Sequence, residues 1–254
     1  MIALLTDFGT KDGYVGAMKG VIKAISPTTS IIDISHEISP QNVAEAKFVL
    51  WTVCRYFPPR TIFVCVVDPA VGTNRKIIAL KTKDHTFLAP DNGLLDMVLG
   101  QYKIKKAVEV TNERYFLKNV SNTFHGRDIF SPVAAHLANG IKFGALGRAI
   151  SLNKSEEVIV HIQRRVQCGG IIIYVDRFGN LITNFKMKRM RSALLRINDI
   201  SIPLKATYGE VGEGEFVAYF GSSGLIEIAV RNGNAQHKTS ATYGSAVDLI
   251  AKET

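Results

Sequence analysis

The chain has 254 residues, of which 46% are hydrophobic and 21% are charged. This length suits one large domain or two ordinary ones, and the composition excludes a disordered, collagen-like or coiled-coil protein. Apolar runs such as residues 62–67 are far shorter than the roughly 18 residues of a membrane span, and no signal peptide is evident. Three cysteines without paired spacing (Cys54, Cys65 and Cys168) favour reduced thiols in a cytoplasmic protein over a disulfide framework or a zinc site.

The net charge is +9, from 31 Lys and Arg against 22 Asp and Glu. A basic balance is compatible with a nucleic-acid partner or with an anionic substrate. The densest basic stretch comprises Lys186, Lys188, Arg189 and Arg191, and it contains no aromatic residue. Such a run is more typical of a solvated face than of an RNA-binding patch, so we do not expect a nucleic-acid partner.

Strands and helices alternate over the first part of the chain. Short apolar or β-branched runs predict strands at residues 2–6, 30–34, 61–67, 77–81 and 86–89. Apolar residues at helical spacing predict helices at residues 15–25, 43–53 and 126–138. Asp12 is expected to cap the first helix. This alternation predicts an α/β domain with a mostly parallel sheet over residues 1–153.

The pattern changes after about residue 153, where short runs alternate with turn residues. Strands are expected at residues 171–175, 181–183, 194–197, 201–204, 216–220, 225–230 and 246–250. Hairpin turns are expected at residues 178–180, 198–199 and 221–224. No segment of helical length is obvious. The second half, residues 165–254, is therefore predicted to be a compact antiparallel β domain, either a sandwich or a barrel.

Polar residues follow two of the predicted parallel strands. Asp7 comes directly after the first strand, where open α/β sheets bind ligands. Its carboxylate can accept hydrogen bonds from ribose hydroxyls, or it can simply cap the turn. Asp68 and Arg75 bracket a Pro- and Gly-containing loop after the strand at 61–67. They can contribute to a site at the same edge, or form a structural ion pair that pins the loop.

Three further polar clusters have a functional and a structural interpretation. His125, at a predicted helix start, can exchange protons near neutral pH or can be held by backbone hydrogen bonds. Residues 176–180 form either an ordinary turn or a loop whose Asn180 amide reads a base edge. Residues 221–224 form either a turn or a nest for a carboxylate. Residues 91–93 are interpreted as a loop.

Several common catalytic motifs are absent from the sequence. It contains no GxxxxGK[ST], HExxH, CxxC or GxSxG pattern. P-loop phosphoryl transfer, zinc hydrolysis and lipase chemistry are therefore unsupported.

Seven segments carry a more specific signal. In chain order they are LLTDFGTKDGYVGAMKG, IIDISHEISPQNVAEA, VVDPAVGTNR, APDNG, TFHGRDIF, DRFGNLITN and SSGLIEIAVRNGNA. Together they resemble one family, the S-adenosyl-L-methionine (SAM) hydroxide adenosyltransferases, relatives of the fluorinases and chlorinases. The resemblance runs from residue 1 to about residue 235, so it covers nearly the whole chain.

The resemblance implies a fold and a reaction. The expected fold is an N-terminal α/β domain followed by a C-terminal antiparallel β-barrel domain. The expected assembly is a homotrimer that binds SAM between the N-domain of one subunit and the C-domain of the next. Hydroxide attacks the ribose 5′ carbon and releases adenosine and L-methionine. SAM is the substrate, so no cofactor or metal is expected, and no membrane partner is expected.

The resemblance also assigns roles to individual residues. The water-activating set falls on Asp68, Arg75 and His125, and it leaves open whether Asp68 or His125 takes the proton. The substrate-binding positions are Asp7 at the ribose hydroxyls, Asp176 at the methionine ammonium, Asn180 and Tyr208 at the adenine, and Ser222 and Ser223 at the methionine carboxylate.

Three alternatives to SAM hydrolysis are considered. Halide transfer is disfavoured because the halogenases lack the Asp–Arg–His set and because Gln41 stands where fluorinases carry a tryptophan. A non-catalytic SAM or nucleoside sensor is disfavoured by the complete set. An RNA-binding protein is suggested only by the net charge.

Overall fold

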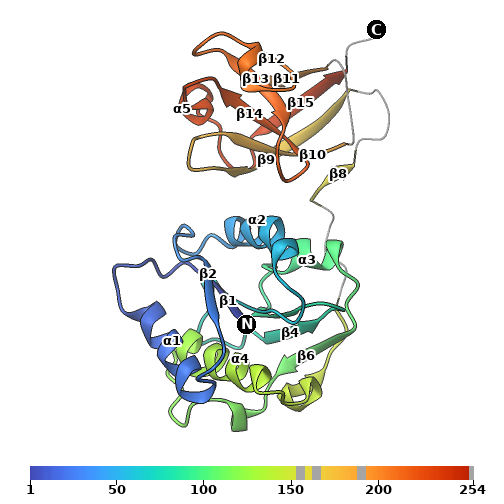
Figure 1. Ribbon diagram of the computed structural model, residues 1–254. Helices are drawn as coiled ribbons and strands as arrows, with labels where there is room; N and C mark the ends of the chain where they lie inside the picture. The colour runs from blue at the N-terminus through green and yellow to red at the C-terminus, as the bar shows by residue number, and fades with distance from the viewer. Residues whose placement is uncertain (153–157, 162–166, 188–192, 252–254) are drawn as a thin grey trace. The chain divides into compact units, whose positions relative to one another are not determined.

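The computed structural model describes residues 1–152, 158–161, 167–187 and 193–251, which form two compact units, Met1–Glu156 and Glu157–Thr254 (Figure 1). The predicted break at residues 153–165 lies largely outside the described residues. Most of the basic stretch, Lys188, Arg189 and Arg191, also lies outside them. The first unit is called unit 1 below and the second unit 2, and each is described by itself.

Unit 1 contains a seven-stranded sheet in the order β2-β1-β3-β5-β4-β6-β7. The strands are β1 (Ile2–Thr6), β2 (Ile31–Ser35), β3 (Ile62–Val66), β4 (Ile77–Lys81), β5 (Thr86–Pro90), β6 (Lys106–Val110) and β7 (Gly147–Ala149). β2, β1, β3 and β5 run parallel to one another, whereas β4 pairs antiparallel with both β5 and β6. β6 therefore points the same way as the parallel group, and β7 pairs antiparallel with β6. The predicted α/β domain is confirmed, with a mixed sheet in which most strands share one direction.

Helices cover both faces of this sheet. They are α1 (Tyr14–Ile25), α2 (Val43–Val53), α3 (Asp96–Gln101) and α4 (Ser131–Ala138), with short helical turns η1 (Cys54–Tyr56), η2 (Glu113–Tyr115), η3 (Gly126–Phe130) and η4 (Phe143–Leu146). On β1, Ile2 and Leu4 pack in a core with α1 and α4, whereas Ala3 and Leu5 pack in a second core with α2 and α3. This strand is thus buried on both faces, as its continuous apolar sequence predicted.

One prediction for these helices is wrong. The N-cap of α1 is Gly13 and no side chain caps it. Because the first helical residue is Tyr14, Asp12 lies one position too early to accept from the free N–H groups of the first turn.

Unit 2 is an antiparallel β-barrel that is nearly closed. Its strands are β8 (Val160–His161), β9 (Cys168–Val175), β10 (Leu181–Lys186), β11 (Ala193–Ile197), β12 (Ile200–Pro203), β13 (Phe216–Phe220), β14 (Leu225–Val230) and β15 (Ala246–Ala251). They follow the order β12-β11-β15-β9-β10-β14-β13, with β8 paired to β10. A bridge between Leu204 and Ala218 joins the two ends of this order.

The predicted hairpins of unit 2 are confirmed. β9–β10, β11–β12 and β13–β14 are antiparallel pairs joined by the three predicted turns. Two short helices were not predicted, η5 (Tyr208–Glu210) and α5 (Ala235–Thr239). Across the described parts of both units, no helix combines the length and hydropathy needed to cross a membrane.

Candidate active site

The carboxyl ends of β1 and β3 bring two of the predicted site residues to one edge of the unit 1 sheet. The two strands are parallel neighbours, with Thr6 opposite Val66. Asp7 follows β1 directly and Asp68 follows β3 by two residues. Their loops therefore emerge beside each other, at the edge where open α/β sheets bind ligands.

Asp68, Arg75 and His125 form one connected group at this edge. Nε of Arg75 donates to Oδ2 of Asp68 at 2.7 Å, and Nη2 of Arg75 lies 2.7 Å from Nδ1 of His125. The side chains of Asp68 and Arg75 are only 4% and 9% exposed, so their charges interact with little screening by solvent. Oδ1 of Asp68 is buried and has no hydrogen-bond partner among the described residues. The group therefore has one acceptor without a partner among the described residues, on Asp68, and this atom is shielded from solvent.

The contact with Arg75 fixes the protonation of His125. Burial lowers the pKa of His125 below its ordinary value of 6.5, and the neighbouring Arg75 charge lowers it further, against the opposite effect of Asp68 and Asp128. An arginine can only donate, so Nδ1 of His125 must accept from it. The imidazole is then neutral with its proton on Nε2, and that N–H is a donor.

Close backbone packing holds the Asp68–Arg75 loop against the segment that leads to His125. Gly72 lies within this loop at φ +80°, and a Cβ atom there would collide with the backbone oxygen of Asn122. Glycine allows both the left-handed backbone and the close approach. Asn92 adds support by donating from Nδ2 to the carbonyl of Val67 at 2.9 Å, so the loop at residues 91–93 braces the end of β3.

His125 stands directly before a π-helical turn, η3, which leads into α4. Asp128 in this turn is fully buried and pairs with Arg127, with Nε of Arg127 2.6 Å from Oδ1. Its Oδ2 also accepts from the backbone N–H of Ser121 at 2.8 Å. Isolated π-turns are rare and often occur at functional sites. The turn ties both flanks of His125 to one buried carboxylate.

Asp7 is held by a hydrogen bond from a residue with an unusual backbone conformation. Its Oδ2 accepts from the backbone N–H of Gln41 at 2.8 Å, and Gln41 has φ +65°. A non-glycine residue in this region costs about 1–3 kcal/mol, and such residues concentrate at functional sites. The described residues give Oδ1 of Asp7 no hydrogen-bond donor, so it is left as an acceptor.

In unit 2 the structure joins Asp176 to Asn180 within the β9–β10 turn. Oδ1 of Asp176 accepts from the backbone N–H groups of Phe178 and Asn180, both at 2.9 Å. Oδ2 accepts from Nδ2 of Asn180 at 2.8 Å. The amide orientation of Asn180 is thereby set, with its side-chain oxygen left as an acceptor.

The other predicted residues of unit 2 lie on and beside β13 and β14. Ser222 and Ser223 lie in the turn between these strands. The Tyr208 hydroxyl on η5 hydrogen-bonds that of Tyr219 on β13, which donates to Oε2 of Glu227 on β14 at 2.8 Å. Burial raises the pKa of Glu227, and nearby Asp176 raises it further, against the hydrogen bond from Tyr219.

Sequence reasoning missed Tyr219 and Glu227. Tyr219 lies inside an apolar strand, and a lone Glu inside a strand is no site signal.

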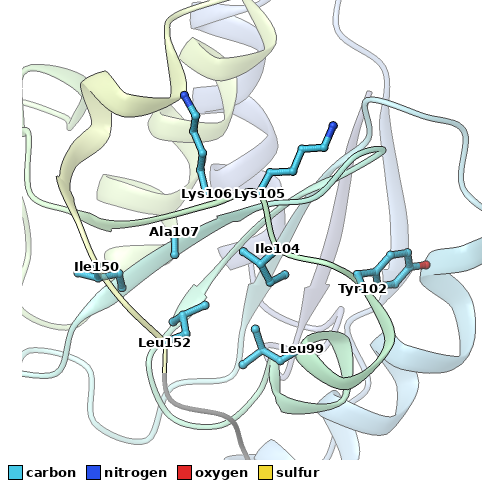
Figure 2. A pocket seen from close by; sticks show the side chains of 8 residues that line it. All are labelled: Leu99, Tyr102, Ile104, Lys105, Lys106, Ala107, Ile150 and Leu152. Atoms are coloured by element: carbon cyan, nitrogen blue, oxygen red, sulfur yellow. The ribbon is translucent and has the colours of Figure 1, made fainter.

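One cavity in unit 1 lies away from these residues. It measures about 370 Å³ and is lined by Leu99, Tyr102, Ile104, Lys105, Lys106, Ala107, Ile150 and Leu152 (Figure 2). In the strand register, Lys106 on β6 lies opposite Lys81 on β4, and Lys81 lies opposite Thr86 at the start of β5. The cavity is therefore at the opposite edge of the sheet from the Asp68 loop. Both lysine side chains extend away from its apolar residues (Figure 2).

Two domain families match the chain. The one described as the SAM hydroxide adenosyltransferase N-terminal domain matches residues 2–147, and the SAM hydroxide adenosyltransferase C-terminal domain matches residues 170–248. The chain belongs to the SAM hydroxide adenosyltransferase family. The resemblance of the seven sequence segments is thus confirmed.

Named relatives of this adenosyltransferase chain include hydrolases and halogenases. It is 35% identical to an (R)-S-adenosyl-L-methionine hydrolase of Methanocaldococcus jannaschii, over 98% of the chain and 95% of that protein. It is 28% identical to a fluorinase of an Actinoplanes species, over 90% of both. A crystal structure of an uncharacterized conserved protein from Thermotoga maritima matches with a TM-score of 0.89 at 38% identity, over 98% of the chain and 100% of that structure.

Proposed function

We propose that this chain hydrolyses SAM to adenosine and L-methionine, with water activated by Asp68, Arg75 and His125. The observation that carries the proposal is the bridge made by Arg75, which contacts Asp68 through Nε and Nη2 and contacts His125 through Nη2. Four relatives at 32–35% identity over 98% of the chain are named SAM hydrolases, and they rank above the fluorinases in similarity.

The reaction needs an oxygen nucleophile more than it needs an acid. The sulfonium already carries positive charge, so its C–S electron pair leaves on sulfur as the neutral thioether of methionine. The water oxygen forms the new bond to the 5′ carbon and its proton passes to a base. Attack of a developing anion on a cation disperses charge, which a site sheltered from water favours. This chemistry calls for no cofactor, and we propose that none is used.

We assign the proton to Asp68. Its Oδ1 is buried and has no hydrogen-bond partner among the described residues, whereas Nδ1 of His125 is occupied by Arg75. Arg75 holds the carboxylate through Oδ2 and directs the remaining oxygen. A positioned base of this kind contributes about 10²–10⁴ in rate.

We assign to His125 an orienting role. With Nδ1 accepting from Arg75, its Nε2–H donates to the water oxygen and to the hydroxide that forms. Arg75 adds its fixed positive charge to the same developing anion. The three side chains then act as one unit, in which loss of any member misplaces the others.

The remaining assignments concern substrate binding. We propose that Asp7 accepts from the ribose hydroxyls through Oδ1, and that Asn180 accepts from the adenine amino group through its free side-chain oxygen. Both are supported by the partners that occupy their other polar atoms. We further propose Tyr208 beside the adenine, Asp176 at the methionine ammonium, and Ser222 and Ser223 at its carboxylate.

The assembly and location are also proposals. A homotrimer with sites shared between subunits would bring the unit 1 group of one subunit to the unit 2 group of another. A cytoplasmic location is supported by Cys54, Cys65 and Cys168, all of which are free thiols.

Product identification tests the activity. The purified chain is incubated separately with the two sulfonium epimers of SAM, and the products are identified by mass. The expected products are adenosine and methionine in equal amounts, and Asp68→Ala should abolish them. Fluoride and chloride are added in parallel reactions. A 5′-halogenated nucleoside would favour halide transfer, and tight SAM binding without any product would favour a sensor.

A further inference from the structure

A second polar network lies behind the loop that carries Asp7. Nδ1 of His36 lies 2.8 Å from Oγ1 of Thr6, and Nε2 of His36 lies 3.1 Å from Oδ1 of Asp33. Oδ2 of Asp33 accepts from Nζ of Lys19 at 2.6 Å. The network crosses from α1 through β2 to the end of β1, and β1 and β2 lie side by side (Figure 1).

The chemistry of these groups determines which atom donates and which accepts in each contact. A carboxylate beside Nε2 favours the tautomer that carries its proton there. Nδ1 of His36 then accepts from the hydroxyl of Thr6, and Oγ1 of Thr6 accepts from the backbone N–H of Phe8 at 3.3 Å. Nε2 of His36 makes an ion-pair contact with Asp33 and has no hydrogen-bond partner among the described residues, so the hydrogen-bonded part of the network runs from His36 through Thr6 to the N–H of Phe8.

The order hydroxyl, imidazole and carboxylate is that of a nucleophilic triad, but burial excludes this role. The side chain of Thr6 is fully buried, and His36 is 5% exposed. The hydroxyl is also tied to a backbone N–H of its own loop. No substrate atom can approach Oγ1 without unfolding the end of β1, so the network acts on the loop.

That loop is held at three points by the segment from residue 36 to residue 41. The carbonyl of His36 accepts from the backbone N–H of Gly9 at 2.7 Å, and its ring holds Thr6. At the far end of the segment, the N–H of Gln41 binds Oδ2 of Asp7. Asp7 lies between Thr6 and Gly9, so both flanks of its backbone are fixed by the same histidine.

We infer that His36 is a positioning residue, which acts through Thr6 to aim the free carboxylate oxygen of Asp7 at the ribose hydroxyls of the substrate. The inference rests on the ribose role proposed for Asp7. It adds that ribose recognition depends on a buried imidazole which never touches the substrate. A carboxylate that is already held in its binding orientation loses less conformational freedom when the ligand binds.

The test compares two nucleosides that differ only in the hydroxyls concerned. Binding of adenosine and of 2′,3′-dideoxyadenosine is measured by calorimetry for the wild type and for Asp7→Asn, His36→Gln, Thr6→Val and Thr6→Ser. The ratio of the two affinities isolates the hydroxyl contacts from general loss of structure. His85→Gln is the matched control, because His85 is a buried histidine of unit 1, 6% exposed, outside this network.

The wild type should prefer adenosine by about tenfold or more, as expected for hydrogen bonds to a charged acceptor. Asp7→Asn, His36→Gln and Thr6→Val should each lose most of this preference, whereas Thr6→Ser and His85→Gln should keep it. If Asp7→Asn loses the preference and His36→Gln keeps it, the positioning role is wrong and the ribose role of Asp7 stands. If Asp7→Asn keeps the preference, the ribose role itself fails and the inference fails with it.

Discussion

Nη2 of Arg75 lies 2.7 Å from Nδ1 of His125, across 50 positions of sequence. Because the guanidinium has no lone pair to offer, this contact requires an unprotonated Nδ1 on the histidine. The same arginine holds Oδ2 of Asp68. In the mechanism that we propose, this relationship separates the roles within the group: His125 orients, Arg75 supplies charge, and Asp68 accepts the proton.

Replacement of Asp68 tests this division. Asp68→Asn keeps the shape of the side chain but removes the base, so kcat for adenosine release should fall by about 10²–10⁴. The KM for SAM should change far less, because the proton is transferred only in the transition state. Steady-state kinetics measure both quantities. A variant within threefold of the wild-type kcat would contradict the assignment.

The pH dependence of activity should follow the lowered pKa of His125. Once protonated, the imidazole can no longer accept from Arg75, and the contact between Arg75 and His125 is lost. We therefore expect kcat to fall as the pH drops through the pKa of His125, with a midpoint below 6.5, because burial and Arg75 lower that pKa. In His125→Gln, the fall in kcat at low pH should move to another pH or disappear. An unchanged profile in that variant would assign this fall to another group.

The same pKa difference predicts a change in stability. A histidine whose pKa is lower in the folded state favours folding when it is neutral, so its contribution is present above pH 6.5 and is lost as the pH falls through the folded pKa. The free energy of unfolding of the wild type should therefore drop at acid pH more steeply than that of His125→Gln. Denaturant titrations at several pH values measure both slopes. Parallel slopes would be inconsistent with the lowered pKa.

Gly72→Ala should disturb the group without altering any of its members. The added Cβ meets the backbone oxygen of Asn122 at a left-handed φ, so the loop must shift, and we expect a loss of stability of more than about 1 kcal/mol together with reduced kcat. Gly20→Ala is the control, since Gly20 is an exposed residue of α1 with no neighbour near a Cβ. That variant should be neutral or slightly stabilising. Equal effects of the two substitutions would argue against the close packing of the loop.

Subunit mixing tests the shared site. Asp68→Ala damages the unit 1 half of a site, and Asp176→Ala damages the unit 2 half. If sites form between subunits, reassembled mixtures of these two inactive variants should contain some intact sites and regain part of the activity. Mixtures that remain inactive, or a wild-type protein that is active as a monomer, would rule out the shared site.

Local sequence was sufficient for most elements of the fold. Residues 2–5 are all apolar because β1 is buried on both faces, and the turn residues at 198–199 stop two short strands where the β11–β12 hairpin turns. The strands β6 and β7 were not predicted, because one is only partly buried and the other has three residues whose position depends on pairing. The cap at Asp12 failed because the helix begins at Tyr14, which makes Gly13 and not Asp12 its N-cap.

The sequence was sufficient to place the candidate residues Asp7 and Asp68 at one edge of the sheet. The carboxyl ends of parallel strands meet at one edge, so Asp7 and Asp68 had to emerge near each other. The proton assignment was not predictable, because it depends on which nitrogen of Arg75 meets which nitrogen of His125. The role proposed for His36 could not be predicted either, since its partner Thr6 lies 30 residues away.

The most direct test of the account is the origin of the oxygen in adenosine. The chain is given SAM in ¹⁸O-labelled water, and both products are analysed by mass with fragmentation. Direct attack of activated water on the 5′ carbon predicts one label in the 5′ hydroxyl of adenosine and none in methionine, and Asp68→Asn should form the labelled adenosine at a rate reduced in proportion to kcat. Label in methionine, or adenosine without label, would contradict hydroxide attack and the role given to Asp68, Arg75 and His125.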